Sequence, residues 1–559
     1  YGYNYLAVSG SQGRDQIVVS HNSVAGTSFT LQTDQGAQIW GSVDLGDSND
    51  SLVLEADTHL DLVGDLDMGS GDSQSVTVGV GADLSVRAIK GSKVDLSIAG
   101  TATLGGDPVR GVFDSDTPSA LKKGNTLSTY TGTTTINEGG TLRAGQAWSL
   151  SSQSIHQVDG TLKLGDNPVR DDNNGREDQE IGELTGSGLV SLGNQSHLYY
   201  GGLNGDVEFS GTSEGNGSLV KEGTGTTTFT GSFGHTGFTK VHGGTLLIGL
   251  GGTLNSSSTV VLAGQGGTLD LGGTTQPVDK IQFWNGKQGT LKNGFLNTGT
   301  VEVQGAGFIE SVGAVVEKSV SSDGVDINQG SASLVVVGLG DDGREYGGYL
   351  TMSGDNHFKD LALTKGKVLL DSGSLVLNSG VTGSVDTDAL VLKGALTLNE
   401  DQTIDLDGGN DLFFIGEKGS LIAAPVEGAE EELEDLAEVD SEQVEKLKIT
   451  IDGGAGDLDI FWDASGNYYG LTESADGLFT ESEDSQLAGY VKNFEIVGVA
   501  GQGIAYFGTI PSFATLQAEG SPPPGEYGLI LGSVGKNTPV VDQKLTINSG
   551  YQSGSFDSL

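Results

Sequence analysis

The sequence predicts an all-β solenoid of stacked turn–strand units, and two observations support this prediction. The tripeptide Gly-Thr-Leu recurs as a glycine turn that leads into a short alternating strand, at roughly twenty-residue spacing. One such unit cannot bury its apolar face alone, so it must stack on the next unit. The tripeptide begins at Gly140, Gly160, Gly244, Gly252, Gly267 and Gly289.

Length and composition agree with a solenoid. The chain has 559 residues, and a solenoid accommodates this length because its core grows along one axis. Its 93 glycines follow no strict triplet period, which excludes collagen. Strand-like runs such as residues 333–337 are frequent, which argues against disorder.

The charge balance excludes several classes of partner. With 28 Lys and Arg against 74 Asp and Glu, the formal net charge of −46 repels nucleic acid and anionic membrane surfaces. It favours a solvated surface, with attraction of divalent cations or basic partners as the alternative. The absence of cysteine excludes disulfides and thiolate metal sites. No segment has the apolar length of a membrane-spanning helix, so we expect no membrane insertion by this chain.

The sequence of the N-terminal part predicts short strands separated by turns that are rich in Asp, Gly and Ser. Residues 51–55 and 60–63 alternate as strands with one buried face. Residues 100–110 return as residues 160–170, and both copies end in Pro-Val-Arg. This repetition indicates duplication within the chain.

The clearest repeat covers residues 217–249. It contains Leu-Val-Lys-x-Gly-x-Gly-Thr at 219–226, Thr-Gly-x-Thr-x-Val at 236–241 and Gly-Thr-Leu at 244–246. Its Thr, Val and Phe residues suit a pleated, half-buried surface, and glycine at the corners supplies the positive φ of tight bends.

This string resembles the autotransporter-associated β-strand repeat of bacterial autotransporter passengers. Residues 217–249 match the whole motif, and residues 121–145 match its second half. The resemblance implies a pertactin-like, right-handed parallel β-helix that is exported through a C-terminal outer-membrane barrel. No such barrel is in the sequence. The chain opens at Tyr1 and ends inside what looks like a repeat, so we expect a fragment of a longer protein.

One segment breaks the pattern. Residues 429–447 lack glycine and consist largely of good helix formers, with acidic residues first and Lys446 near the end. We expect a short amphipathic helix here, inserted between coils. The expected domains are residues 1–120, N-terminal coils; 121–422, the β-helix with the repeats; 423–448, the acidic helical insertion; and 449–559, less regular and truncated β-rich coils.

Two motifs for chemistry are weak. Residues 211–215 fit Gly-x-Ser-x-Gly, but a glycine-rich turn and a strand follow where a nucleophilic serine needs a helix. Residues 338–343 resemble a dinucleotide fingerprint, but Asp341 and Asp342 would repel a pyrophosphate. We expect His235 and His242 to lie on the surface. No catalytic, cofactor-binding or metal-binding residue is assigned.

Asp-rich turns are the one candidate for a cofactor. Residues 44–50, 405–411 and 452–457 are similar to the glycine–aspartate nonapeptides that bind calcium, although they are not tandem. Ordinary Asx turns are the preferred interpretation. We therefore expect no cofactor, with calcium as the alternative.

The functional prediction is a non-enzymatic adhesin or stalk, the passenger of an autotransporter-like protein at the bacterial cell surface. Host or cell-surface glycans, proteins, or other copies of the same chain are the expected partners. A β-helical enzyme acting on polysaccharides is the first alternative, because β-helices also carry such enzymes. These enzymes need carboxylates clustered on one face, and no pair of acidic residues stands out in the sequence. A purely structural spacer is the second.

Overall fold

The computed structural model describes the chain in two compact units, residues 1–281 and 282–559. The described residues are 8–9, 16–20, 29–32, 37–39, 42–47, 49–105, 126–165, 178–286, 288–296, 299–312, 320–321, 324–325, 332–338, 347–399, 402–416, 418–424, 448–455, 459–463, 471–473, 479–481, 488–492, 496–499 and 505–506.

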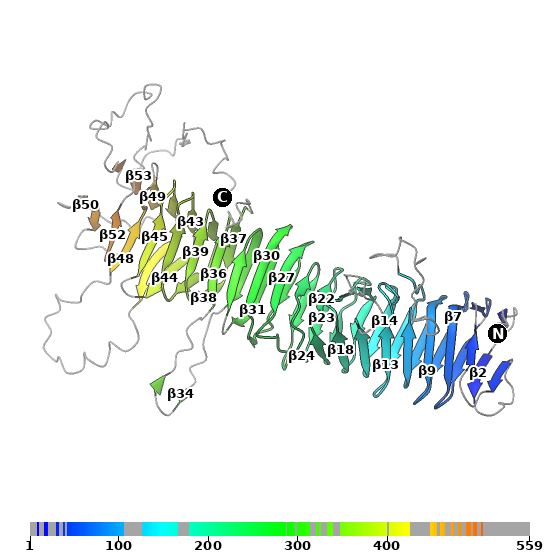
Figure 1. The fold of residues 1–559 in the computed structure, drawn as a ribbon. Coiled ribbons are helices and arrows are strands. Elements are labelled where there is room, and N and C mark those ends of the chain that lie inside the picture. The colour runs from blue at the N-terminus through cyan, green and yellow to red at the C-terminus, as the bar shows by residue number, and fades with distance from the viewer. Residues whose placement is uncertain are drawn as a thin grey trace, which may run out of the picture. The chain divides into compact units, whose positions relative to one another are not determined.

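Both units are parallel β-solenoids. Within each unit a strand pairs in parallel with the strand one coil later, so each sheet runs through successive coils (Figure 1). In the N-terminal unit, Leu142 pairs with Leu162, so the Gly-Thr-Leu repeats that begin at Gly140 and Gly160 are in register. The repeats of the sequence are therefore the rungs of the structure.

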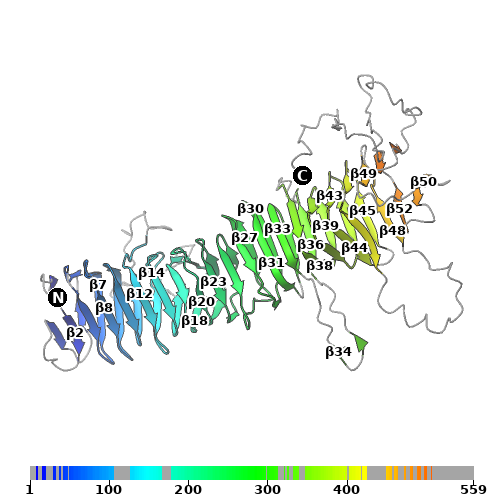
Figure 2. The same ribbon diagram turned by 180° about the vertical axis from the view of Figure 1, so that it is seen from behind.

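The described strands of the N-terminal unit belong to four sheets, and Figure 2 shows these strands from behind. The first sheet contains β1 (Val8–Ser9), β5 (Val43–Asp44), β7 (His59–Asp67), β9 (Asp83–Lys90), β11 (Thr101–Leu104), β13 (Thr141–Ala144), β15 (Thr161–Leu164), β18 (Leu189–Leu192), β21 (Thr212–Gly215) and β24 (Ser232–Phe233), with β4 (Ala37–Ile39) beside β7. The second contains β3 (Phe29–Gln32), β2 (Gln16–Ser20), β6 (Ser51–Leu54), β8 (Gln74–Val78), β10 (Val94–Ile98), β12 (Gly132–Ile136), β14 (Ser154–Val158) and β17 (Glu183–Thr185).

The other two sheets of this unit carry the clearest repeat. One contains β16 (Gln179–Glu180), β19 (His197–Tyr200), β22 (Ser218–Lys221), β25 (Thr239–Val241) and β27 (Thr259–Gly264). The other contains β20 (Val207–Phe209), β23 (Thr226–Phe229), β26 (Thr245–Ile248) and β28 (Thr268–Asp270). Residues 217–249 thus supply rungs to both sheets.

The described strands of the C-terminal unit lie mainly in three parallel sheets. The first contains β32 (Thr300–Val303), β36 (Ser333–Val337), β39 (Leu361–Thr364), β42 (Val381–Ser384), β45 (Thr403–Asp407), β48 (Lys448–Asp452) and β52 (Ala488–Lys492). The second contains β31 (Gly289–Leu296), β33 (Ala306–Val312), β37 (Tyr349–Ser353), β40 (Lys367–Leu370), β43 (Ala389–Leu392), β46 (Leu412–Ile415), β49 (Ile460–Asp463) and β53 (Ile496–Val499). The third contains β38 (Asp355–Phe358), β41 (Ser374–Leu377), β44 (Ala395–Asn399) and β47 (Ser420–Ala424).

Some pairs in the C-terminal unit are antiparallel. β51 (Phe479–Glu481) pairs antiparallel with both β50 (Leu471–Glu473) and β52, and β54 (Ala505–Tyr506) does so with β53. β34 (Val320–Ser321) and β35 (Gly324–Val325) form a separate antiparallel pair.

The core follows from the alternation within each strand. In β26, Leu246 and Ile248 are fully buried, whereas Thr245 and Leu247 between them face outward and are half-buried. Successive side chains of a strand point to opposite faces, so one face of every rung fills the inside of the coil. Parallel stacking then places apolar residues of neighbouring rungs directly against each other, as Leu246 lies against Leu269.

Glycine at the corners is required by close stacking of the backbone. A Cβ added at Gly231 would lie 1.7 Å from the carbonyl oxygen of Gly211, one coil earlier. No side chain fits in that space, which explains why the repeat keeps glycine at this corner.

The predicted all-β parallel β-helix is confirmed, and its right hand stays a prediction. The helix expected over residues 429–447 lies outside the described residues. The domain boundaries expected at residues 120, 422 and 448 stay predictions.

Candidate functional site

The coil interior is filled with side chains, so ligands meet the outward faces and the corners. Three groups of residues could carry chemistry: an ion-pair network on the first sheet, an aromatic cluster on the third, and polar groups sealed inside the coil.

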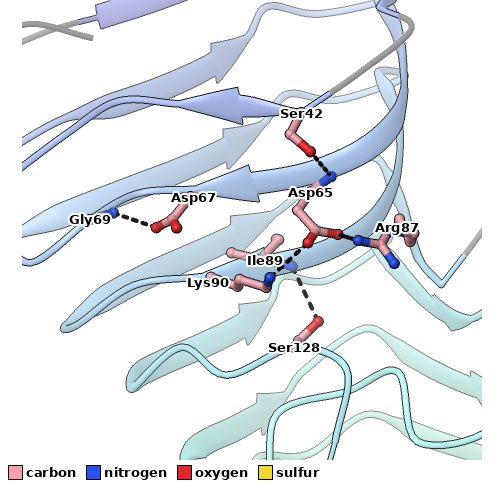
Figure 3. A network of polar contacts seen from close by, with 8 residues as sticks. All are labelled: Ser42, Asp65, Asp67, Gly69, Arg87, Ile89, Lys90 and Ser128. Atoms are coloured by element: carbon pink, nitrogen blue, oxygen red, sulfur yellow. Dashed lines mark hydrogen bonds and ion pairs between the residues drawn. The ribbon is translucent and has the colours of Figure 1, made fainter. Parts of the chain in front are cut away.

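Asp65 is the centre of the ion-pair network shown in Figure 3. Its Oδ1 lies 2.7 Å from Nη2 of Arg87, and its Oδ2 lies 2.7 Å from Nζ of Lys90. The Asp65 backbone N–H donates to Oγ of Ser42 at 3.2 Å. The register of β7 against β9 shifts between Leu62 and Asp65, which places the carboxylate beside both cations.

This network joins neighbouring coils. The Asp65 residue is only 7% exposed, whereas the two cationic side chains reach the surface. A buried carboxylate is tolerated when it is paired and hydrogen-bonded, and removal of the cations would leave it uncompensated. The geometry therefore supports a structural role.

An aromatic cluster lies on the outside of the N-terminal unit. Trp148, in the connection between β13 and β14, stacks on Tyr199 of β19 with ring centroids 5.7 Å apart and planes at 30°. His197, also on β19, meets Tyr199 edge-on at 5.9 Å, and its Nδ1 lies 3.3 Å from the Tyr199 hydroxyl. All three side chains are half-buried.

The backbone of Trp148 is unusual. Its φ is 60°, and among the described residues no other aromatic residue has a positive φ. The Trp148 N–H donates to the Asp178 carbonyl at 2.7 Å, and the Trp148 carbonyl accepts from the Leu127 N–H at 2.7 Å. These two bonds hold a bulky residue in a conformation that normally favours glycine.

The Asp-rich turns are Asx turns. The Asp44 Oδ1 accepts from the Gly46 N–H at 2.9 Å, and Asp67 makes the same bond to Gly69 one coil later. In the same way, the Asp405 Oδ1 accepts from the Asp407 N–H at 3.0 Å, and the Asp452 Oδ1 accepts from the Gly454 N–H at 3.0 Å. In the described part of the chain, no three His, Asp or Glu side chains gather as a metal site. The expectation of no cofactor, with calcium as the alternative, stays a prediction.

The serine of the Gly-x-Ser-x-Gly match points into the coil. Ser213 lies on β21, is 3% exposed, and its Oγ lies 2.7 Å from Nδ1 of His235. The His235 Nε2 lies 3.1 Å from Oγ1 of Thr239. The predicted surface position of His235 is wrong, because its ring is fully buried and completes this internal chain.

Burial also sets the protonation of the internal histidines. It lowers the pKa of His235 to about 4, and it does the same to the pKa of His156, which is fully buried on β14. His156 Nδ1 lies 3.1 Å from the Ser154 carbonyl, and its Nε2 has no hydrogen-bond partner among the described residues. Both rings are therefore neutral at pH 7. In contrast, the His242 side chain is 31% exposed and lies 3.6 Å from Glu222.

The lysine of the repeat motif is also internal. Lys221 faces into the coil in register with Tyr200, is 1% exposed, and its Nζ donates to the Glu222 carbonyl. Burial lowers the pKa of Lys221, and the nearby Glu183 and Glu222 oppose that shift. Burial raises the pKa of Glu183, whose Oε1 accepts from the Gly205 N–H at 2.8 Å. The motif lysine is thus an internal group that hydrogen-bonds the backbone just after β22.

A ladder of buried aspartates runs through the C-terminal unit. Asp388, Asp411 and Asp459 each precede a strand of the second sheet and are at most 1% exposed. Desolvation raises the pKa of Asp388 to about 6 and that of Asp411 to about 8, against an ordinary value of 3.8. Asp411 is consequently protonated at pH 7.

Residues 339–343 of the dinucleotide-like motif, and the two Pro-Val-Arg exits, lie outside the described residues. Sequence reasoning missed the aromatic cluster, the internal serine–histidine pair and the aspartate ladder. The signal for the serine–histidine pair was Ser213 in the inward phase of β21, and that phase needs the register to be known. Trp148 and the three aspartates lie outside the strands, so no strand pattern marked them.

Comparison with known proteins adds a relationship in sequence. No family model matches the chain, and no solved structure matches it. A curated protein that matches is the adhesin BmaC autotransporter of Brucella suis biovar 1 (strain 1330), which is 27% identical over 319 residues. The match covers 53% of this chain and 8% of that protein. The chain therefore spans a small part of its relative's length.

The expected resemblance to autotransporter passengers is confirmed. The related protein is an autotransporter, and this chain has the β-solenoid fold that the repeat motif implied. The described residues contain no helix with the length and apolarity needed to cross a bilayer.

Proposed function

We propose that this chain is a passenger segment of a bacterial surface adhesin and that it binds its targets without catalysis. The observation that carries the proposal is the sequence relationship to an adhesin across about half of the chain, on a parallel β-solenoid. A solenoid offers long outward faces on which contacts repeat from coil to coil. Its place of action is the cell surface or the extracellular space.

The charge of the chain supports this role. A net charge of −46 keeps the chain soluble and suppresses non-specific contact with nucleic acid and anionic lipid. Binding then depends on local groups on the outward faces, with glycans or proteins of a cell surface, or a second copy of the chain, as targets.

The test is attachment of a non-adherent bacterium that displays the chain on its surface. We expect attachment to cultured cells, and loss of attachment when an excess of the purified chain is added. The same purified chain is incubated with a panel of polysaccharides, and new reducing ends are measured. Reducing-end release would overturn the non-enzymatic role, and absence of attachment would favour a spacer.

A further inference from the structure

We propose that Trp148, Tyr199 and His197 form a subsite for the ring of a neutral sugar. This inference rests on the proposed adhesin function and names one place on the chain where a glycan target is held.

The first argument is the backbone at Trp148. The chain has 93 glycines, and it places glycine at most of its positive-φ corners. At position 148 it has tryptophan with a φ of 60°, held by hydrogen bonds to residues 127 and 178. Such a conformation is strained for a residue other than glycine, and strained residues cluster at functional sites. Glycine would satisfy the backbone, so it is the indole that this position requires.

The second argument is the surface that the indole completes. Trp148 stacks on Tyr199 and both side chains are half-buried, so the two rings are held in fixed positions with part of their aromatic surface exposed. The C–H face of a hexose or N-acetylhexosamine ring is apolar and packs on such a surface. Aromatic side chains combine this packing with a fixed geometry and a small loss of side-chain entropy.

The third argument is the mixture of polar groups around the rings. The Tyr199 hydroxyl and the His197 ring supply a donor and an acceptor next to each other. Asp178, whose Oδ1 accepts from the backbone N–H of His197 at 2.8 Å, and Glu180, in register with Tyr199, add carboxylate acceptors. Sugar hydroxyl groups both donate and accept, so this mixture suits them. A cationic peptide would use the acceptors alone.

The fourth argument concerns the charge of the ligand. Asp178 and Glu180 lie beside the rings, and the whole chain carries −46 charges. Both disfavour a sialylated or sulfated glycan through like-charge repulsion. The structure therefore assigns a neutral sugar to this subsite.

The experiment is calorimetric titration of the purified chain with lactose, mannobiose and chitobiose, with sialyllactose and a lysine-rich peptide as comparisons. We expect at least one neutral sugar to bind and Trp148→Ala to weaken that binding by about tenfold or more, as for an aromatic residue at the centre of an interface. Trp284→Ala is the matched control, since Trp284 is an outward tryptophan elsewhere, 39% exposed, and its loss should leave binding unchanged.

Trp148→Gly separates function from folding. Glycine accepts a φ of 60° without strain, so we expect an unchanged or higher Tm together with loss of sugar binding. The inference would be overturned if Trp148→Gly bound the sugar as tightly as the unaltered chain does. It would also be overturned if the chain bound the lysine-rich peptide but no neutral sugar. If displayed chain still supports cell attachment in that case, only the subsite is wrong; if attachment is absent as well, the adhesin proposal fails.

Discussion

The Oδ1 atom of Asp411 accepts a hydrogen bond from the backbone N–H of Asp388 at 2.7 Å, and Asp459 makes the same 2.7 Å bond to the N–H of Asp411. Each carboxyl group thus reaches back to the previous coil. Parallel coils lie about 4.8 Å apart, so these buried acids are close neighbours and cannot all be ionised. The ladder joins the coils of the C-terminal unit, and its contribution depends on pH.

We predict that the C-terminal unit loses stability as the pH rises from about 4 to 8. The pKa of Asp411 is about 8 in the folded chain and 3.8 ordinarily, so folded Asp411 keeps a proton that the unfolded chain releases in that interval. The stabilising contribution of protonated Asp411 is complete below pH 3.8 and is lost as the pH rises through 8. The protection factors of the β43 and β46 amides at pH 5 and pH 8, with the intrinsic effect of pH on exchange removed, measure this change.

Asp411→Asn is the matched variant for that profile. Asparagine keeps an oxygen that accepts from the Asp388 N–H, but it cannot ionise. We expect protection factors in β43 and β46 that vary less with pH than in the unaltered chain. An equally steep profile in the variant would show that Asp411 does not cause it.

The N-terminal unit should respond to pH in the opposite direction. The pKa of buried His156 and His235 is about 4 in the folded chain and 6.5 ordinarily, so the unfolded chain binds protons that the folded chain excludes. Stability falls as the pH drops from 6.5 toward 4. We expect lower protection factors, which are exchange rates corrected for the intrinsic effect of pH, for the β14 and β25 amides at pH 4.5 than at pH 7. His235→Asn should reduce the loss of protection in β25 at low pH. His357→Asn is the control, because His357 is half-buried on β38, and it should leave the pH dependence of β25 unchanged.

Neighbouring leucines in one repeat should differ strongly in their contribution to stability. Leu246 is fully buried, whereas Leu247 faces outward. Leu246→Ala removes buried methyl groups and leaves a cavity, so we expect a loss of about 2–5 kcal/mol. Leu247→Ala should cost much less. Local unfolding measured by hydrogen exchange of β26 compares the two, and equal losses would contradict the assignment of inward and outward faces.

Alanine should be harmful at one corner glycine and harmless at another. Gly231→Ala forces a Cβ to within 1.7 Å of the Gly211 carbonyl oxygen, whereas a Cβ at Gly202 meets nothing within 4 Å. We expect the first change to cost about 1–3 kcal/mol or more, as overpacking does, and the second to be close to neutral. Thermal unfolding of both variants tests this, and a neutral Gly231→Ala would mean that the coils stack less closely.

The rungs could be predicted from sequence because their signal is local. A glycine, a Thr and a Leu in alternation predict a strand, and residues 141–144, 161–164 and 245–248 are strands. The inward position of Lys221 also had a local signal, since it lies two residues after Leu219 and therefore on the same face. The charge of lysine concealed that signal, because a charged residue is normally expected outside.

The internal polar groups and the aromatic cluster could not be predicted from sequence alone. Ser213 meets His235 only because two coils stack in one register, and Trp148 meets Tyr199 for the same reason. The positive φ at Trp148 is set by backbone bonds to residues 127 and 178, which lie in other coils. Contacts between coils depend on a register that no single repeat specifies.

The central claim is that coils stack in parallel with the repeats in register, and disulfide formation between introduced cysteines tests it most directly. The chain has no cysteine of its own. Thr141 pairs with Thr161, and Thr161 pairs with Leu189 one coil further on. We predict that Thr141→Cys with Thr161→Cys forms an intramolecular disulfide on mild oxidation, because adjacent parallel strands lie about 4.8 Å apart. Thr141→Cys with Leu189→Cys should not, because two strand spacings exceed the reach of a disulfide. Equal oxidation of both pairs, or of the second pair alone, would contradict the account.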